Sequence, residues 1–573
     1  MAKIPEENKM MKNIQILRKK FEKYKIDGYV VPKNDEYFTE YSKINRLQII
    51  SNFSGSAGLA IILKKKNYLF TDGRYTIQSQ NESGKNFKIL GFEKLINCDL
   101  FKNLTLGIDP KLFTNSQIKK FFLKNNKIKC INKNLIDEIK KQRENFKIPF
   151  FSLNKNIVGE SASSKINKIS KYLKKNKSDY IFISAPENVA WILNIRGGDG
   201  PNSPVPNSRL IISKTKKILL ISEMEKCKNL IKNKTIKLNQ FLDINELPDK
   251  LFKLKGNKFI IDDKSCSIFY EKLINSKFKI INREDPSYLL KAIKNKIEIN
   301  NMINAHILDG VALTKFIYWI KEINKNEITE VDAAKKLESF RKMNKNFLYP
   351  SFDTIAGSGK NGAIVHYRAQ KENCRNINKK DIFLCDSGGQ YKYGTTDVTR
   401  TICFTKQGQN IKNIFTKVLK GHIAVATTNI NKDNTGKKID KRARKFLRES
   451  NLDYAHGTGH GVGFFLNVHE GPQSITKINK VKIKEGMILS NEPGYYKKNN
   501  FGIRIENLVY VSKKKEKLLF ENLTMAPIEK DLINFKLLND EEKNYLFKYH
   551  LNVYTKISKY LNDNEKKWLA SFI

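Results

Sequence analysis

Residues 381–404 read DIFLCDSGGQYKYGTTDVTRTICF, two apolar strand patterns on either side of a glycine-containing turn. This arrangement is typical of a β-hairpin. With the tip near residues 391–392, the pattern places Asp386 and Asp397 opposite each other, with Cβ atoms roughly 5 Å apart. Because like charges in facing positions destabilise a sheet, the hairpin predicts a positive partner for this pair.

A second arrangement of this kind follows at residues 487–511, MILSNEPGYYKKNNFGIRIENLVYV. There Glu492 and Glu506 flank a turn centred near Asn499, each on a strand-like stretch. Between the two hairpins, residues 456–472 read HGTGHGVGFFLNVHEGP and contain three of the seven histidines of the chain. Four carboxylates and a glycine-flanked histidine form an oxygen-rich donor set with one nitrogen. Such a set suits a pair of divalent ions such as Mn²⁺ or Co²⁺, with Zn²⁺ as an alternative.

Each of these features has a simpler interpretation when it is taken alone. Two aspartates on one hairpin usually belong to a solvated face, and a loop of glycines and histidines is usually a flexible loop. All five residue types, in the order Asp, Asp, His, Glu, Glu and each in its own local pattern, instead favour a metal centre. Two ions about 3.5–4 Å apart can hold a hydroxide between them and polarise a carbonyl group.

Residues 356–511 closely resemble aminopeptidase P (Xaa-Pro aminopeptidase), a family of pita-bread metallopeptidases. The matching motifs are NGAIVHY, DSGGQYKYGTTDVTRTICF, HGTGHGVGFFLNVHEGP, NEPGYY and FGIRIEN. Upstream, SNFSGSAGLAIIL and TDGRYTIQ resemble the first domain of the family, and NVAWILNIRGGDGPNSPV resembles the second domain of its long form. The resemblance implies an α/β (α+β) chain with two N-terminal α/β creatinase-type domains and a C-terminal pita-bread catalytic domain.

We expect the three domains at residues 1–152, 153–287 and 288–573, the last with a C-terminal extension. A polar break that contains a proline, near residues 143–155, predicts the first boundary, and Asp285-Pro286 predicts the second. Helical and strand patterns alternate similarly in the first two segments, which is compatible with a duplicated domain.

The resemblance also implies the ligands of a dinuclear metal centre, which are Asp386, Asp397, His460, Glu492 and Glu506. Asp397 and Glu506 match the positions that bridge both ions. Asp386 matches a ligand of one ion, and His460 and Glu492 match ligands of the other. Glu492 also matches the carboxylate that passes a proton from the nucleophilic water.

Four further residues are expected to take part in catalysis. His366, His456 and His469 resemble the non-ligand histidines of the family around the scissile bond. Arg504 shares a strand face with Glu506 at i, i+2, so we expect it to anchor a metal-binding carboxylate. The remaining histidines have no such context and are expected to be structural; they are His306, His422 and His550.

The implied activity is hydrolysis of the N-terminal Xaa-Pro bond of peptides by a metal-bridging hydroxide. The resemblance implies two metal ions per chain, with Mn²⁺ expected and Co²⁺ or Zn²⁺ as alternatives. The resemblance also implies a homodimer. A prolidase-type dipeptidase uses the same ligands, but the long form with two N-terminal domains favours the aminopeptidase. A non-catalytic peptide- or nucleic-acid-binding protein on this scaffold would be favoured by a missing ligand, and all five ligand types are present.

The net charge of +48 comes from 106 basic and 58 acidic residues. The lysines are spread along the whole chain, which indicates a compositional trend and predicts no specific nucleic-acid partner. The seven cysteines include no C-x-x-C pair, so we interpret them as reduced thiols of a cytoplasmic protein. No run of about 18 apolar residues occurs, and we expect no membrane partner.

Overall fold

The computed structural model describes residues 6–96, 100–122, 125–140, 148–324, 326–371 and 374–573. The chain forms two compact units, one of residues 1–155 and 160–287 and the other of residues 156–159 and 288–573. Part of the expected polar break, residues 143–147, lies outside the described residues.

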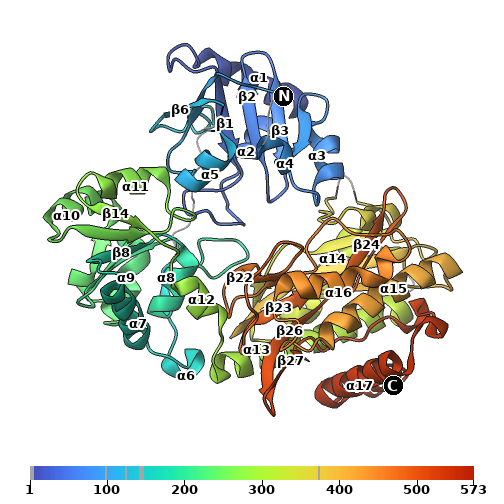
Figure 1. The fold of residues 1–573 in the computed structure, drawn as a ribbon. Helices are drawn as coiled ribbons and strands as arrows, with labels where there is room; N and C mark the ends of the chain where they lie inside the picture. The colour runs from blue at the N-terminus through green and yellow to red at the C-terminus, as the bar shows by residue number, and fades with distance from the viewer. Residues whose placement is uncertain (1–5, 97–99, 123–124, 141–147, 325, 372–373) are drawn as a thin grey trace. The chain divides into compact units, whose positions relative to one another are not determined.

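The first unit contains two six-stranded mixed sheets (Figure 1). The strand order of the first sheet is β4-β3-β2-β1-β5-β6. Its strands are β1 (Gly28–Pro32), β2 (Leu59–Leu63), β3 (Asn67–Thr71), β4 (Lys88–Gly91), β5 (Thr105–Ile108) and β6 (Lys127–Cys130), and its helices are α1 (Glu6–Lys19), α2 (Arg46–Ser51), α3 (Thr76–Ser83), α4 (Phe92–Ile96) and α5 (Asn115–Phe121). The lysine-rich segment 64–66 forms the turn between β2 and β3, as its sequence predicts.

The second sheet has the order β12-β11-β10-β8-β13-β14. Its strands are β8 (Tyr180–Ile183), β10 (Arg209–Ser213), β11 (Ile218–Ser222), β12 (Phe241–Asp243), β13 (Lys258–Ile261) and β14 (Lys279–Asn282), and its helices are α7 (Ala162–Lys175), α8 (Pro186–Leu193), α9 (Met224–Lys232), α10 (Leu247–Lys253) and α11 (Ile268–Asn275). A short ladder, β7 (Phe151–Ser152) with β9 (Ile195–Arg196), lies beside it. The two sheets share the same order and the same parallel or antiparallel sense at every pairing. The two similar sequence cycles therefore fold in the same way.

The second unit consists of antiparallel sheets and long helices. Its sheets are β15 (Phe347–Pro350), β18 (Gly389–Tyr391) and β19 (Gly394–Thr395); β16 (Ile355–Ser358), β17 (Ile382–Ser387) and β20 (Val398–Cys403); β22 (Glu470–Ile475), β21 (Gly459–Gly461), β23 (Ile488–Asn491), β26 (Asn507–Lys514) and β27 (Lys517–Asn522); and β24 (Gly494–Lys497) with β25 (Phe501–Arg504). Its helices are α6 (Lys155–Val158), α12 (Ser287–Ala292), α13 (Lys296–Tyr318), α14 (Glu330–Lys342), α15 (Gln409–Ala426), α16 (Gly436–Arg448), α17 (Asp540–Ile557) and α18 (Asp563–Ala570).

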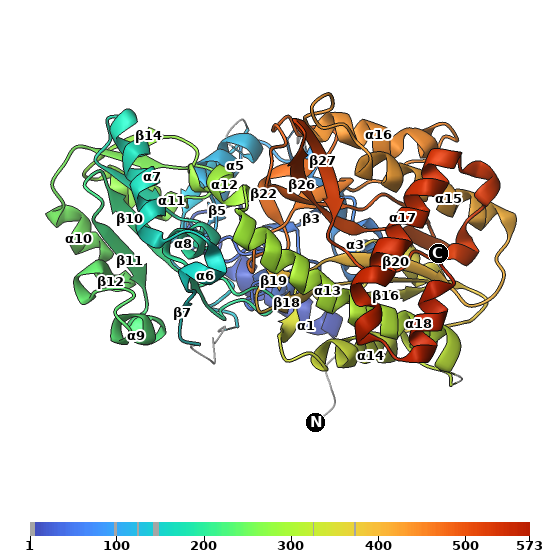
Figure 2. The ribbon, with the colours of Figure 1, turned by 90° about the horizontal axis from the view of Figure 1, so that it is seen from below.

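Helices pack against the sheets of the second unit and support the two hairpins. The longest helix, α13, begins with a capping box in which Asn295 and Glu298 satisfy each other's backbone N–H groups. Figure 2 shows the C-terminal helices α17 and α18 beside α13, and both pack against it. Helix α15 packs against β23, β24 and β25, three of the four strands that flank the two predicted glutamates.

Two further features bear on the expectations from the sequence. Within the described residues, none of the helices is both long and apolar enough to cross a membrane. The cysteines that the structure describes are free thiols, and Cys98 lies outside the described residues.

Candidate metal centre

The first predicted hairpin forms, but with a different register. Asp386 lies on β17 opposite Thr399, and Asp397 directly precedes β20, so the expected face-to-face pairing of the two aspartates is wrong. The two-residue turn lies at 392–393, because β18 and β19 pair on either side of it. Moving the tip by one position moves the register by two residues, which keeps both side chains on the same face of the hairpin.

The second hairpin turns near Asn499, as predicted. Its two arms are each interrupted at a glutamate: Glu492 lies between β23 and β24, and Glu506 lies between β25 and β26. The pairing has the same register on both sides of the interruption, since Asn491 faces Asn507 and Gly494 faces Arg504. The two glutamates therefore occupy facing positions in a gap of one continuous hairpin, and their own N–H groups bond outside the hairpin, to the carbonyls of Thr458 and Thr399.

His460 lies in the middle of the short strand β21, and the glycines on both sides have a packing reason. A Cβ atom on Gly459 would come within 1.9 Å of the Ser490 carbonyl oxygen, and one on Gly461 within 2.2 Å of the Glu470 carbonyl oxygen. Neither position accepts a side chain, because neighbouring backbone already fills the space. The Nδ1–H of His460 donates to the Gly461 carbonyl at 2.9 Å, which leaves Nε2 to face the carboxylates.

The predicted ligands converge on this nitrogen. Nε2 of His460 lies 3.4 Å from Asp397 Oδ2 and 3.4 Å from Glu492 Oε1. Asp397, His460 and Glu506 each offer one ligand atom, and these atoms lie within 4.8 Å of one another. The carboxyl groups of Asp397 and Glu506 are nearly inaccessible to solvent. A compact group of carboxylates with one imidazole can hold a divalent cation.

The electrostatics of the cluster indicate the same chemistry. Burial and the charge of Asp386 outweigh the hydrogen bond from His460 and raise the pKa of Asp397 to about 6. Burial and the neighbouring carboxylates raise the pKa of Glu506 well above its ordinary value. Although burial opposes its charged form, the hydrogen bond to Asp397 and the charge of Glu492 raise the pKa of His460 to about 9.

These shifts mean that the carboxylates repel one another unless a proton or a cation lies among them. One observation favours a cation over a proton: Asp386 Oδ1 is buried and has no hydrogen-bond partner. A buried carboxylate oxygen without a donor is costly, and a metal ion would complete its coordination. The residues present therefore fit a metal centre.

Arg504 supports two of the carboxylates. Its Nη2 donates to Asp386 Oδ2 at 2.6 Å, and its Nε donates to the Thr399 hydroxyl at 3.0 Å. Thr399 in turn donates to Glu506 Oε2 at 2.6 Å. The third donor of Arg504, Nη1, bonds to the Tyr496 hydroxyl at 2.6 Å. One buried guanidinium thus contacts Asp386 directly and Glu506 through a threonine hydroxyl.

His456 is connected to this group through Tyr496. Its Nδ1–H donates to its neighbour's carbonyl, Gly457 O, at 2.7 Å, so its Nε2 accepts from the Tyr496 hydroxyl at 2.8 Å. The Tyr496 hydroxyl accepts from Arg504 and donates to His456, which gives a continuous chain of hydrogen bonds from His456 to Asp386.

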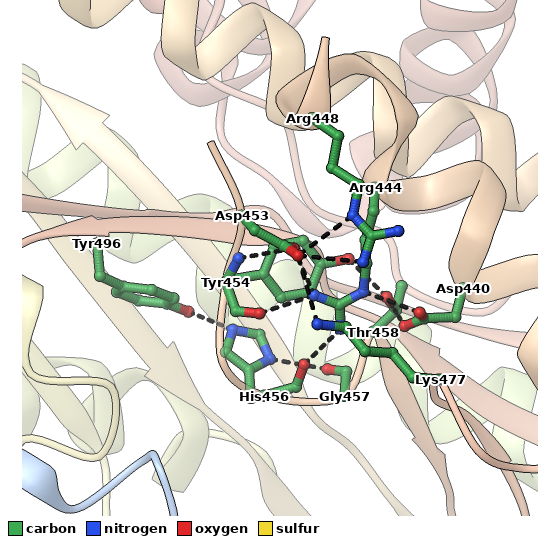
Figure 3. A network of polar contacts seen from close by, with 10 residues as sticks. All are labelled: Asp440, Arg444, Arg448, Asp453, Tyr454, His456, Gly457, Thr458, Lys477 and Tyr496. Atoms are coloured by element: carbon green, nitrogen blue, oxygen red, sulfur yellow. Dashed lines mark hydrogen bonds and ion pairs between the residues drawn. The ribbon is translucent and has the colours of Figure 1, made fainter. Parts of the chain in front are cut away.

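A second network fixes the loop that carries His456 (Figure 3). The buried guanidinium of Arg444 donates to the carbonyls of Tyr454 and His456, both at 2.7 Å, and pairs with Asp440 at 2.8 Å. Asp440 also accepts from the Thr458 hydroxyl at 2.7 Å. Because Arg444 and Asp440 both lie on α16, this helix determines the path of the loop between His456 and His460.

The remaining predicted histidines lie at different places. The ring of His469 stands edge-on to that of His460, with centroids 4.2 Å apart. His366 is half-buried and follows the 3₁₀ turn η4 (Gly359–Ala363), which packs against β24 and β25. The structure therefore brings His469 directly to the cluster, whereas for His366 it shows that the turn just before it packs against the hairpin of the two glutamates.

Three supporting residues were missed at the level of sequence: Thr399, Tyr496 and Ser490. Ser490 donates to Glu492 Oε1 at 2.9 Å and accepts from the backbone N–H of His460 at 2.9 Å. Each of the three is two or four residues from a predicted ligand, and alternation along the strand would have indicated a shared face. The sequence pattern could not show which residue on the same strand face would hydrogen-bond to a metal ligand.

A second group of metal-ligand types consists of Cys403, Glu529 and Asp531. The ammonium of Lys321 already lies there, 2.6 Å from Glu529 Oε2 and 3.1 Å from Asp531 Oδ2. An ion pair accounts for this group, which is therefore not a second metal centre.

Comparison with known proteins defines the class first. The model of metallopeptidase family M24 matches residues 300–513, and the C-terminal region of this peptidase family matches residues 516–571. Two creatinase/prolidase N-terminal domains match residues 13–139 and 141–298. The fold class expected from the sequence, two creatinase-type domains followed by a catalytic metallopeptidase domain, is thus confirmed.

Individual relatives narrow the class. A probable Xaa-Pro aminopeptidase P of Laccaria bicolor is 38% identical over 96% of this chain and 91% of its own length. The crystal structure of X-prolyl aminopeptidase from Caenorhabditis elegans, described as a cytosolic enzyme with a di-nuclear active site, matches with a TM-score of 0.90 and 28% identity over 98% of this chain and 99% of that chain. The prolidase from Pyrococcus furiosus matches 62% of this chain and 98% of its own, with a TM-score of 0.51 and 25% identity. The chain belongs to the aminopeptidase P family of the M24 metallopeptidases.

Proposed function

We propose that this protein is a metal-dependent Xaa-Pro aminopeptidase, which hydrolyses the bond between the N-terminal residue of a peptide and a following proline. The observation that carries the proposal is the convergence of two aspartates, two glutamates and a histidine in one buried cluster of a chain that matches aminopeptidase P relatives over its length. Such a bond resists most peptidases, since the proline ring removes the amide N–H and restricts the backbone.

The proposed ligands are the five residues of the cluster. Asp397 and Glu506 would hold both of two divalent ions, Asp386 would add a ligand to one of them, and His460 with Glu492 would add ligands to the other, as the resemblance to the family implies. Mn²⁺ is the proposed metal, with Co²⁺ or Zn²⁺ as alternatives, because four carboxylates and one imidazole form a hard donor set. When bound, the two ions supply an activated water and polarise the scissile carbonyl.

The other side chains hold the substrate and move protons. Glu492 accepts a proton from the attacking water and delivers it to the proline nitrogen, while Ser490 holds its Oε1 by a hydrogen bond of 2.9 Å. His469, beside His460, donates to the developing oxyanion together with His366. His456 supports these groups from beside the scissile bond: its Nδ1–H donates to the Gly457 carbonyl, and its Nε2 accepts from the Tyr496 hydroxyl, which links it to Arg504.

Several finer assignments accompany this proposal. The domains comprise residues 1–152, 153–287 and 288–573, and the protein works in the cytoplasm without a membrane or a specific nucleic-acid partner. It is a homodimer.

A paired substrate assay tests the activity. The full-length protein is stripped with a chelator, reloaded with Mn²⁺, and given a tripeptide Xaa-Pro-Yaa and a dipeptide Xaa-Pro. We expect metal-dependent release of the N-terminal residue from the tripeptide. Cleavage of the dipeptide alone would identify a prolidase-type dipeptidase instead, and metal binding without hydrolysis would identify a non-catalytic binding protein. The molar mass in solution, measured by light scattering, tests the dimer.

A further inference from the structure

The gap in the second hairpin contains a backbone carbonyl that its facing residue cannot satisfy: Ile505 donates its N–H to the Pro493 carbonyl at 3.3 Å, but proline has no N–H to return to the Ile505 carbonyl. Inside the gap, the N–H of Glu492 bonds to the Thr458 carbonyl at 2.8 Å, and the N–H of Glu506 bonds to the Thr399 carbonyl at 3.1 Å. The carbonyls immediately before these glutamates, of Asn491 and Ile505, face α15. The Ile505 carbonyl therefore requires a donor from elsewhere in the protein.

A single side chain donates to the Ile505 carbonyl and to the Asn491 carbonyl on the opposite arm. The Nδ1–H of His422, on α15, lies 3.1 Å from the Asn491 oxygen and 3.2 Å from the Ile505 oxygen. The Asn491 side chain returns a bond of 2.9 Å to the carbonyl of His422. The imidazole is fully buried, so it cannot exchange these bonds for water. His422 therefore ties together the two arms of the hairpin at the level of the two glutamates.

The chemistry of this imidazole keeps the connection permanent. Its Nε2 is buried and has no hydrogen-bond partner, so Nδ1 carries the single proton of a neutral ring. Burial and the nearby charge of Arg400 lower the pKa of His422 to about 3. On the other side of the gap, Nη1 of Arg400 donates to the Glu506 carbonyl at 2.7 Å. The backbone of Glu506 is thus held at both of its ends.

We propose that His422 is a positioning residue of the metal centre, in which one N–H holds the carbonyls that precede Glu492 and Glu506 and so sets the separation of their carboxylates. The inference rests on the ligand assignment of the proposed function. Both glutamates would be ligands of the same metal centre, so a change in the separation of their carboxylates is expected to weaken metal binding before it unfolds the protein.

The alternative is an ordinary core histidine that only stabilises the fold. The two roles predict different effects of replacing His422 by asparagine or by glutamine. An asparagine amide nitrogen is attached to Cγ and occupies the place of Nδ1, whereas a glutamine amide nitrogen lies one bond further out, near the place of Nε2. If position alone matters to the carboxylates, asparagine at 422 preserves metal binding and glutamine does not, although both remove the ring.

The control is a histidine of the same kind outside the gap. His306 is also buried, its Nδ1 donates to a backbone carbonyl, Met302 O, at 2.7 Å, and its Nε2 has no partner. Its carbonyl partner belongs to its own helix, α13. His306→Gln therefore loses a comparable buried hydrogen bond without releasing either glutamate.

The experiment measures Mn²⁺ affinity and stoichiometry of the chelator-stripped full-length protein by calorimetry, with the melting temperature of the stripped protein alongside. We expect His422→Gln to weaken Mn²⁺ binding at least about tenfold and His422→Asn to stay within about threefold of the natural protein. His306→Gln should lower the melting temperature but leave the affinity unchanged.

Unchanged Mn²⁺ affinity in His422→Gln, or equal losses in the glutamine and asparagine variants, would overturn the positioning role while leaving the metal centre intact. If the natural protein bound no Mn²⁺, the proposed function itself would fall, and the inference with it. Should His422→Gln not fold, Asn491→Ala removes the return bond from the other partner; at least a threefold loss of affinity supports the inference, and no loss refutes it.

Discussion

Substitution of Arg504 by lysine should damage both the stability of the stripped protein and its activity. The buried guanidinium makes three hydrogen bonds at 2.6–3.0 Å, to Asp386, Thr399 and Tyr496. A lysine ammonium can keep the contact with Asp386, but its point charge cannot span the other two directions. Hydrogen bonds to a charged donor contribute about 1.5–3 kcal/mol each, so losing two costs about 3–6 kcal/mol.

In a domain of the size of the second unit, about 3 kcal/mol corresponds to a melting temperature lower by about 6 °C. Differential scanning calorimetry of the metal-free protein measures this shift. Without its arginine, Thr399 no longer has a fixed orientation toward Glu506, and we expect kcat to fall about 10- to 100-fold, which corresponds to about 1.4–2.7 kcal/mol of transition-state stabilisation.

The matched control is Arg442→Lys on α16, where an exposed arginine makes one ion pair of 3.4 Å with Asp433. Exposed pairs of this kind contribute about 0–1 kcal/mol, so the control should melt within about 2 °C of the natural protein. If Arg504→Lys melted with the control and kept full kcat, the network around Asp386 would have no supporting role and the reasoning would be refuted.

Further predictions concern the ligands, the histidines and the charge. Asp397→Asn should abolish turnover and lower the metal content, since a bridging carboxylate is lost; activity with two bound ions would contradict the assignment. His460→Ala should lose metal as well as rate, whereas His469→Ala should keep its metal and lose about 10²–10³-fold in kcat; metal analysis with kinetics separates them, and the reverse pattern would exchange their roles. Burial lowers the pKa of His306 from 6.5 to about 4. Between pH 6.5 and 4 this histidine is protonated in the unfolded chain but neutral in the folded chain. The free energy of unfolding therefore decreases by about 3 kcal/mol as the pH falls through this range. His306→Gln should reduce the slope of the free energy of unfolding against pH between pH 6.5 and 4. An unchanged slope would show that His306 does not contribute to this pH dependence. Salt between about 50 and 200 mM should scarcely change hydrolysis of a neutral tripeptide, while DNA binding should be weak and steeply salt-dependent; tight binding to a particular DNA sequence at about 150 mM salt would show that the basic excess is functional.

The sequence by itself determined the features that depend on local pattern. Alternation and turn residues predicted both hairpins, and the turn near Asn499 lies where it was expected. The order of donors along the chain predicted a metal-binding group, because residue types suffice to define donor chemistry. The glycines beside His460 are visible in the sequence, but only the structure shows why no side chain fits there, since the Ser490 and Glu470 carbonyls fill the space.

Tertiary structure decided what depends on partners far along the chain. A shift of one position in the turn at 392–393 placed Thr399, instead of Asp397, opposite Asp386, and local pattern is the same for both registers. His422 is a second example of a role that the local sequence does not reveal. Nothing in its neighbourhood on α15 distinguishes it from a core histidine, yet its Nδ1–H reaches Asn491 and Ile505, 69 and 83 residues away. Such contacts are set by how helix and hairpin pack, and one-dimensional periodicity does not contain that information.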